Sequence, residues 1–153
     1  MGRTLFWVAA VVGCVHAAAS AYWALGGRWL LNTVGSWAVD AATTAPLLTS
    51  LVLGVVALAK VAAAVIPVLV EYGRIGATRF WRGVSWIGGI GLIFYGGTNT
   101  VVAAAVLAGV IHSDTGYDEA AMIGHAYLWD PLFLVWGLSL TAALILTRSA
   151  DRL

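Results

Sequence analysis

The sequence predicts an all-α fold, in which four transmembrane helices form a bundle and a short interfacial helix joins the first two. Of the 153 residues, 61% are hydrophobic and only 10% are charged, which leaves more apolar surface than a soluble domain of this size can bury. The chain also holds four apolar runs, each close to or above the roughly 20 helical residues that cross a bilayer. We therefore expect a single integral membrane domain, residues 1–153.

The four spans are predicted at about residues 5–25, 46–70, 84–111 and 129–147. Gly26 and Gly27 mark the end of the first span, because glycine is common just past a helix C-terminus. The second span carries one charge, Lys60, near its middle. For the fourth span, Asp130 followed by Pro131 indicates a helix start, with the aspartate as N-cap and the proline at the first helical position.

A short helix is expected between the first two spans. Residues 28–45 are moderately polar, and their apolar positions recur at helical spacing. These positions are Trp29, Leu30, Val34, Trp37 and Ala38. A helix of this kind would lie in the membrane interface or dip into it.

Positive charges outside the spans are unevenly distributed. The N-terminus, the second connection and the C-terminus together carry Arg3, Arg74, Arg79, Arg82, Arg148 and Arg152. The first and third connections carry only Arg28. Because cytoplasmic connections are enriched in Lys and Arg, we expect a multi-pass cell-membrane protein. Its N- and C-termini and its second connection would lie in the cytoplasm, and its first and third connections outside.

Lys60 is the residue that most needs an explanation. A cation at the bilayer centre costs roughly 2.5–3.5 kcal/mol on insertion scales, so it requires a polar partner or a hydrated cavity. Side chains lean toward the N-terminus of their helix, which points Lys60 toward the outer half of the membrane, where His16 and Asn99 lie at similar depth. Two interpretations remain open. Either Lys60 is bonded within the bundle, or it marks a pocket for an anionic or carbonyl-bearing ligand.

Six residues are predicted to line an outward-facing, ligand-binding cavity. They are polar or aromatic residues inside the spans or at their edges, namely His16, Trp23, Lys60, Tyr95, Asn99 and Asp130. A single histidine in a membrane is more often a helix–helix hydrogen-bond donor than a ligand or proton carrier, so His16 is the weaker candidate. Asp130 is interpreted first as a helix cap and second as a counter-charge of the cavity.

Motifs for catalysis, metals and cofactors are not found in the sequence. The one cysteine, Cys14, excludes an internal disulfide and a cysteine-rich metal site. The spacing of His112, Asp114, Asp118 and His125 matches no recognised zinc or calcium loop. No phosphate loop or nucleophile elbow is present, and a net charge of +1 gives no argument for a nucleic-acid partner. We therefore predict no catalytic residues, no metal and no cofactor.

Two stretches resemble a known family. The run from Tyr22 to Trp29, preceded by His16 and Ala17, resembles the first-helix signature of a bacterial family of small four-helix membrane proteins, known only as a domain of unknown function. The run from Trp129 to Leu134, followed by Gly137 and Leu138, is similar to that family's last-helix motif. The family often has serine before the proline, so Asp130 departs from the pattern and receives no role from it. The resemblance covers the whole chain and implies a four-helix membrane fold, but no activity.

Three functional hypotheses follow from the sequence. The first is a non-enzymatic protein that binds a lipid, a quinone or a similar amphiphile, because apolar cavities with a few convergent polar groups suit such ligands, or that acts as an accessory subunit. The second is a small transporter or channel that uses Lys60 and His16. The third is a membrane enzyme acting on lipid head groups. Besides the bilayer, a membrane protein partner or a second copy of the chain remains open, because small residues on the second and third spans favour close helix contacts.

Overall fold

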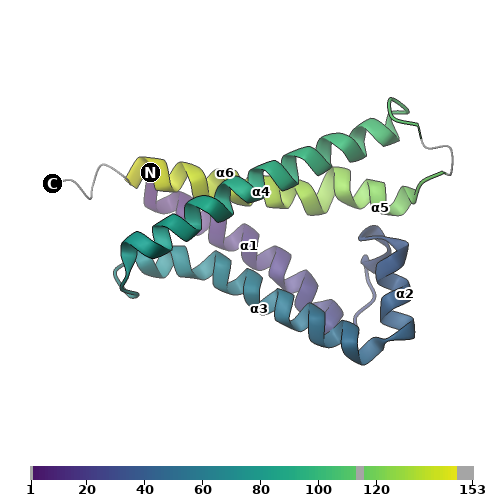
Figure 1. Cartoon of the computed structure of the whole chain (residues 1–153), viewed down its shortest axis with the longest axis horizontal. Helices are drawn as coiled ribbons and strands as arrows, with labels where there is room; N and C mark the ends of the chain where they lie inside the picture. Colours follow the sequence, from purple (N-terminus) through teal and green to yellow (C-terminus); the bar gives the residue numbers. More distant parts are fainter. Residues whose placement is uncertain (1, 113–115, 148–153) are drawn as a thin grey trace.

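The computed structural model describes residues 2–112 and 116–147, and within these residues the fold is all-helical. Four helical stretches are long and apolar enough to cross a membrane, which confirms the predicted all-α, four-helix class (Figure 1). They are α1 (Gly2–Ala24), α3 (Pro46–Glu71), α4 (Thr78–Leu107) and a continuous run of α5 (Glu119–Gly124), η2 (His125–Trp129) and α6 (Asp130–Thr147). The four stretches indicate a multi-pass membrane protein.

Helix α1 is central to the packing, because it contacts both α3 and α6, while α4 packs along α6. Glycines allow α4 and α6 to approach closely. A Cβ atom at Gly96 would lie 2.6 Å from the carbonyl oxygen of Asp130. A Cβ atom at Gly137 would lie 2.7 Å from the carbonyl oxygen of Gly89. Small residues permit such backbone contact between membrane helices, so any larger side chain at Gly96 or Gly137 would push the two helices apart.

Helices α3 and α4 are joined by the turn 72–77 and spread apart as they leave it (Figure 1). At the far end of the bundle lies the segment that links α1 to α3, with η1 (Leu31–Thr33) and α2 (Ser36–Thr44). The predicted short helix between the first two spans is therefore present. Three side-chain contacts attach this segment to the fourth span: Asp118 Oδ2 to the Ser36 amide (2.8 Å), Trp129 Nε1 to Thr33 Oγ1 (3.0 Å), and His125 Nε2 to the Val34 carbonyl oxygen (3.3 Å).

The fourth span differs from its predicted boundaries. Its helix begins at Glu119, about ten residues earlier than expected, and its N-cap is Asp118, whose side chain accepts a hydrogen bond from the Ala121 amide. The interpretation of Asp130 as a cap is wrong, since Asp130 lies inside the helical run and is 1% exposed. Residues 125–129 form a π-helical turn just before Pro131. A widened turn accommodates the proline, which cannot donate to the carbonyl four residues earlier.

The other boundaries agree more closely with the sequence. Helix α1 ends at Ala24, and Gly26 follows with φ of +92°, a left-handed conformation that suits glycine at a helix end. Helix α3 spans Pro46–Glu71. Helix α4 starts at Thr78, before the predicted start at 84, and stops at Leu107, short of 111. The apolar run alone could not indicate either end of α4.

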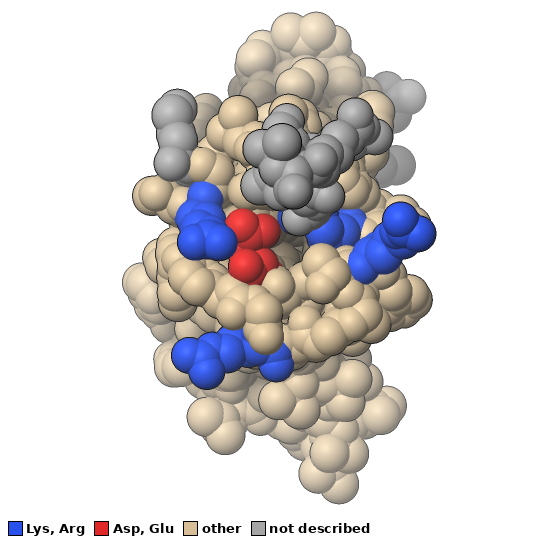
Figure 2. Space-filling model, turned by 90° about the vertical axis from the view of Figure 1, so that its left-hand side faces the viewer, with Lys and Arg blue, Asp and Glu red and all other residues tan. Residues whose placement is uncertain are grey.

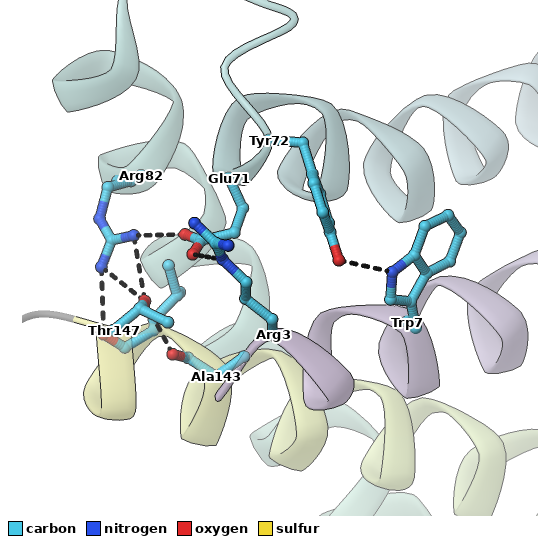
Figure 3. A network of polar contacts seen from close by, with 8 residues as sticks. Arg3, Trp7, Glu71, Tyr72, Arg82, Ala143 and Thr147 are labelled. Atoms are coloured by element: carbon cyan, nitrogen blue, oxygen red, sulfur yellow. Dashed lines mark hydrogen bonds and ion pairs between the residues drawn. The ribbon is translucent and has the colours of Figure 1, made fainter. Parts of the chain in front are cut away.

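Charged side chains gather at the end of the bundle that holds the α3–α4 turn. Glu71 lies between two arginines, with Arg3 Nε 3.4 Å from Oε1 and Arg82 Nη1 3.4 Å from Oε2 (Figure 3). Arg82 also donates to Thr147 Oγ1 at 3.2 Å and to the Leu144 carbonyl oxygen at 3.2 Å. We call Arg3, Glu71, Arg82 and Thr147 the terminal clasp. It ties α1, α3, α4 and α6 together. On this end of the molecule, Figure 2 shows an acidic patch between basic ones.

Candidate functional site

A cavity of about 370 Å³ lies in the half of the bundle away from the α3–α4 turn. Its walls come from α1, α3, α4 and the fourth span, and Val34 and Trp37 cover it from the α1–α3 segment. Five of the six predicted site residues line it, namely His16, Trp23, Lys60, Tyr95 and Asp130. Residues distant in the sequence therefore meet around one space. We call it the polar cavity.

Lys60 projects into the bundle and contacts α1. Its Nζ lies 2.8 Å from Ser20 Oγ and 3.1 Å from His16 Nδ1. It also lies 5.5 Å from the centroid of the Phe133 ring, a favourable cation–π position. Lys60 forms no ion pair with a carboxylate of the described residues. An ammonium carries three donors, and the two hydrogen bonds to α1 occupy two of them.

His16 contributes a second unused donor. Because an ammonium can only donate, His16 Nδ1 accepts from Lys60, and this assigns the ring proton to Nε2. Nε2 is buried and makes no hydrogen bond of standard geometry with the described residues, although the ring also interacts with the Trp129 backbone. The imidazole stacks on Phe133 with centroids 3.9 Å apart, and the whole residue is 5% exposed. A buried N–H without a partner costs about 1–3 kcal/mol, so this position favours an acceptor from outside the chain.

The opposite wall holds a paired acid and base. His125 Nδ1 lies 2.7 Å from Asp130 Oδ2, and His125 Nε2 lies 3.3 Å from the Val34 carbonyl oxygen. Since that carbonyl can only accept, Nε2 carries a proton, and one further proton lies between Nδ1 and the carboxylate. The pair is neutral in total, whether it is written as imidazolium and carboxylate or as imidazole and carboxylic acid. The negative charge of Asp130 is thus already matched, and it does not compensate Lys60.

The remaining candidates occupy defined places. Trp23 donates from Nε1 to the Trp29 carbonyl oxygen at 2.9 Å, so its role is partly structural. Tyr95 is 55% exposed and meets Phe133 edge-on, with centroids 5.6 Å apart. Asn99 does not line the polar cavity. It borders an adjoining pocket of about 230 Å³, which also contacts His125, and its side chain hydrogen-bonds with Asp130.

Three important residues were not among the predicted six. Ser20 lies one helical turn after His16 on the same face, a spacing that could have identified it. Phe133 stacks on His16 and lies beneath Lys60, which no sequence pattern indicates. His125 was considered only as a metal ligand in a loop. Residues five apart do not face each other on an α-helix, so the His125–Asp130 pair depends on the π-helical turn.

The cavity is richer in donors than in acceptors. Lys60 and His16 each offer an N–H that the described residues leave unpaired, whereas the carboxylate of Asp130 is occupied. The cavity also carries the charge of the Lys60 ammonium, which no carboxylate of residues 2–112 or 116–147 pairs. No group of three or more potential metal ligands occurs among the described residues. Such an arrangement suits an oxygen acceptor, and most of all a negatively charged one.

Residues 13–140 match the model of the family described as "protein of unknown function (DUF3995)". The chain belongs to this family. The match confirms the resemblance to a domain of unknown function, and all six predicted site residues lie within the matched range of DUF3995. No curated protein and no solved structure matches the chain.

Proposed function

We propose that this protein binds an amphiphile, such as a lipid or a quinone, in the polar cavity and is not itself an enzyme. One observation carries the proposal: the cavity encloses the Lys60 ammonium without a partner carboxylate of the described residues, and beside it His16 has an unpaired N–H. Burying a cation in this way is costly. A bound acceptor would offset that cost, and the aromatic walls offered by Trp23, Trp129 and Phe133 suit an apolar ligand body.

The direct test is to look for a retained ligand. The protein would be purified in a mild non-ionic detergent, weighed by native mass spectrometry and extracted with solvent to identify lipids and quinones. We expect a stoichiometric amphiphile on the unmodified chain and its loss in Lys60→Met. The matched control is Val55→Met, on the same helix at a position that is 66% exposed. An unmodified protein that is empty after several mild preparations would argue against binding.

A small transporter or channel is the second candidate. Two groups of titratable side chains, Lys60 with His16 and His125 with Asp130, face one cavity from different helices, as a proton or ion pathway requires. The experiment is proton and ion flux in liposomes with a pH-sensitive dye. Flux above that of protein-free liposomes that disappears in Lys60→Met would favour this function. Flux that is the same in Lys60→Met as in the unmodified protein would exclude transport through Lys60.

A membrane enzyme acting on lipid head groups is less well supported. Such an enzyme needs an acid–base pair with a site free to accept a proton. The His125–Asp130 pair has a suitable separation of 2.7 Å, but the second nitrogen of His125 faces the Val34 carbonyl oxygen. The ring therefore has no free nitrogen to act as a base. If the purified protein turned over lipid and His125→Gln stopped that turnover, the enzyme hypothesis would become the best supported of the three.

We also propose that both termini face the cytoplasm. Arg3 and Arg82 lie at the clasp end, and Arg74 and Arg79 belong to the adjacent turn and helix start. Arg148 and Arg152, which add to the same charge asymmetry, lie outside the described residues. A reporter fused to the C-terminus that is active only in the cytoplasm would test this orientation.

Co-purification without cross-linking would test whether the protein is an accessory subunit or self-associates.

A further inference from the structure

A second cavity lies next to the polar one along the same pair of helices, although the two share no lining residue. It has a volume of about 400 Å³ and lies between α3 and α4 on the side of the α3–α4 turn. On α3 it begins at Ala59, which is next to Lys60, and reaches Ile66 and Pro67. On α4 it ends at Leu92, one turn before Tyr95, which belongs to the polar cavity. We call this second space the α3–α4 cleft.

The α3–α4 cleft has the character of a hydrocarbon site. Its α3 wall consists of small and apolar side chains, Ala59, Ala62, Ala63 and Ile66. Ser85 is a polar side chain in the opposite wall, and its hydroxyl donates within α4 to the Trp81 carbonyl oxygen at 2.8 Å. From Lys60 to Ile66 the cleft follows about 9 Å of helix at 1.5 Å per residue. A polar head in one cavity would therefore have an apolar space beside it for its tail.

A further apolar cavity of about 370 Å³ shares Trp23 and Trp129 with the polar cavity, but the outer end of the polar cavity itself is covered. Val34 and Trp37 cover the polar cavity there, and the covering segment is attached by the Asp118, His125 and Trp129 contacts. Between α3 and α4, by contrast, Ala62, Ala63 and Gly88 are exposed. In a membrane these surfaces face lipid. An amphiphile with its head beside Lys60 can thus place its chain in the α3–α4 cleft, toward the bilayer.

Resting on the proposed function, we propose that the ligand is an amphiphile with an anionic oxygen head group, such as a carboxylate or phosphate, bound by Lys60 and His16, and that its hydrocarbon chain occupies the α3–α4 cleft. The uncompensated ammonium and the unpaired N–H of His16 select an anion over a neutral head. The neighbouring position of the two cavities along α3 and α4 makes the α3–α4 cleft the tail site of this proposal.

Two glycines on α4 provide a matched pair of variants. Gly88 lines the cleft, and a Cβ atom there would meet no atom within 4 Å, so Gly88→Phe can place its ring in the cleft without an initial clash. Gly91 has the same open surroundings, yet it lines none of the cavities described above. Both substitutions replace a helical glycine by the same residue. Thermal unfolding in detergent would verify that both variants fold.

The probe is palmitate, with binding measured by native mass spectrometry titration of the purified protein. We expect Gly88→Phe to weaken palmitate binding by about tenfold or more, equivalent to at least 1.4 kcal/mol, and Gly91→Phe to leave it within about twofold. Lipid tails are as apolar as the cleft, so the loss would come from excluded space and lost packing rather than from hydrophobic transfer. Equal affinities for the two variants would overturn the tail placement and leave the proposed function intact.

The head group is tested with chains of equal length. Hexadecyl phosphate and palmitate should both bind more tightly than hexadecanol, and Lys60→Met should abolish this preference. The two anions distinguish a phosphate from a carboxylate source. Decylubiquinone or hexadecanol binding as tightly as the anions would overturn the anionic head. If none of these probes binds and the purified protein also retains no amphiphile, both the inference and the proposed function fail.

Discussion

The terminal clasp and the polar cavity are built from the same kinds of side chain and differ in how completely the chain pairs them. In the clasp, Glu71 receives Arg3 and Arg82, and Arg82 also bonds Thr147. In the cavity, Lys60 has hydroxyl and imidazole partners but no carboxylate of the described residues, and His16 Nε2 has no partner there. The comparison separates polar groups that hold the helices together from polar groups that remain available to a ligand.

The first prediction concerns the acid at the centre of the clasp. Glu71→Ala should lower the free energy of unfolding by about 3 kcal/mol, because removing one partner of a largely buried ion pair leaves the other charge uncompensated. The Glu71 side chain is 13% exposed and that of Arg82 is 15% exposed, which places them in this regime. Unfolding by titration with sodium dodecyl sulfate would measure the change.

The control is Arg79→Ala, because Arg79 is an exposed residue in the first turn of α4 at the same end of the bundle. We expect it to change the unfolding free energy by less than about 0.5 kcal/mol, as is usual for surface substitutions. If Glu71→Ala were as mild as this control, the clasp would not be a structural device and the contrast with the cavity would disappear.

The second prediction concerns the neutral member of the clasp. Thr147 Oγ1 donates to the Ala143 carbonyl oxygen at 2.9 Å and accepts from Arg82 at 3.2 Å. Thr147→Val keeps the shape but removes the hydrogen bond to Ala143 and both of those from Arg82, so we expect a loss of about 1–2 kcal/mol. Thr147→Ser, which retains the hydroxyl, should lose clearly less. Equal losses in the two variants would assign the effect to packing of the methyl group.

The third prediction is that removing the charge in the polar cavity changes stability little, in contrast to the clasp. Lys60→Met removes a cation that costs roughly 2.5–3.5 kcal/mol to insert, but it also leaves Ser20 and His16 without their partner, at about 1–3 kcal/mol for each unpaired group. These terms nearly cancel, so the unfolding free energy of ligand-free protein should change by less than about 1 kcal/mol. A loss as large as that of Glu71→Ala would make Lys60 a structural residue like those of the clasp.

The contrast also shows which features the sequence could predict. The four spans followed from the lengths of the apolar runs, and the proximity of Lys60 to His16 followed from their depth and from the lean of side chains along a helix. Glu71 follows Lys60 by 11 residues on the same helix, which is about 16 Å at 1.5 Å per residue and too far for a contact. Its actual partners, Arg3 and Arg82, come from other helices, and their positions depend on how those helices pack.

Other features needed backbone detail that hydrophobic patterns do not contain. The His125–Asp130 pair exists because a π-helical turn brings together residues five apart. The α3–α4 cleft exists because these two helices separate after their turn, while α4 packs closely on α6 at Gly96 and Gly137. Which helix pairs pack closely and which separate is a property of the whole bundle, and an apolar run does not encode it.

The smallest expected effect concerns the segment that covers the cavity. Asp118, which precedes the fourth span, accepts hydrogen bonds from the Ala121 and Ser36 amides, and these bonds hold the pKa of its carboxyl below the ordinary value of 3.8. Because the pKa is depressed, the stabilisation from this attachment of α2 is fully present at pH values above the ordinary pKa. It is lost as the pH falls through the lower pKa of the folded protein. Neutral pH therefore leaves the cover in place.

Nuclear magnetic resonance of ¹⁵N-labelled protein in micelles would follow this titration at the Ser36 amide. We expect its chemical shift to change with a midpoint below pH 3.8, and to show no such transition in Asp118→Asn. A midpoint at or above the ordinary value would mean that the carboxylate does not hold α2 to the fourth span. Only the His125 and Trp129 contacts would then hold the covering segment over Lys60. The polar cavity would therefore open to water more easily.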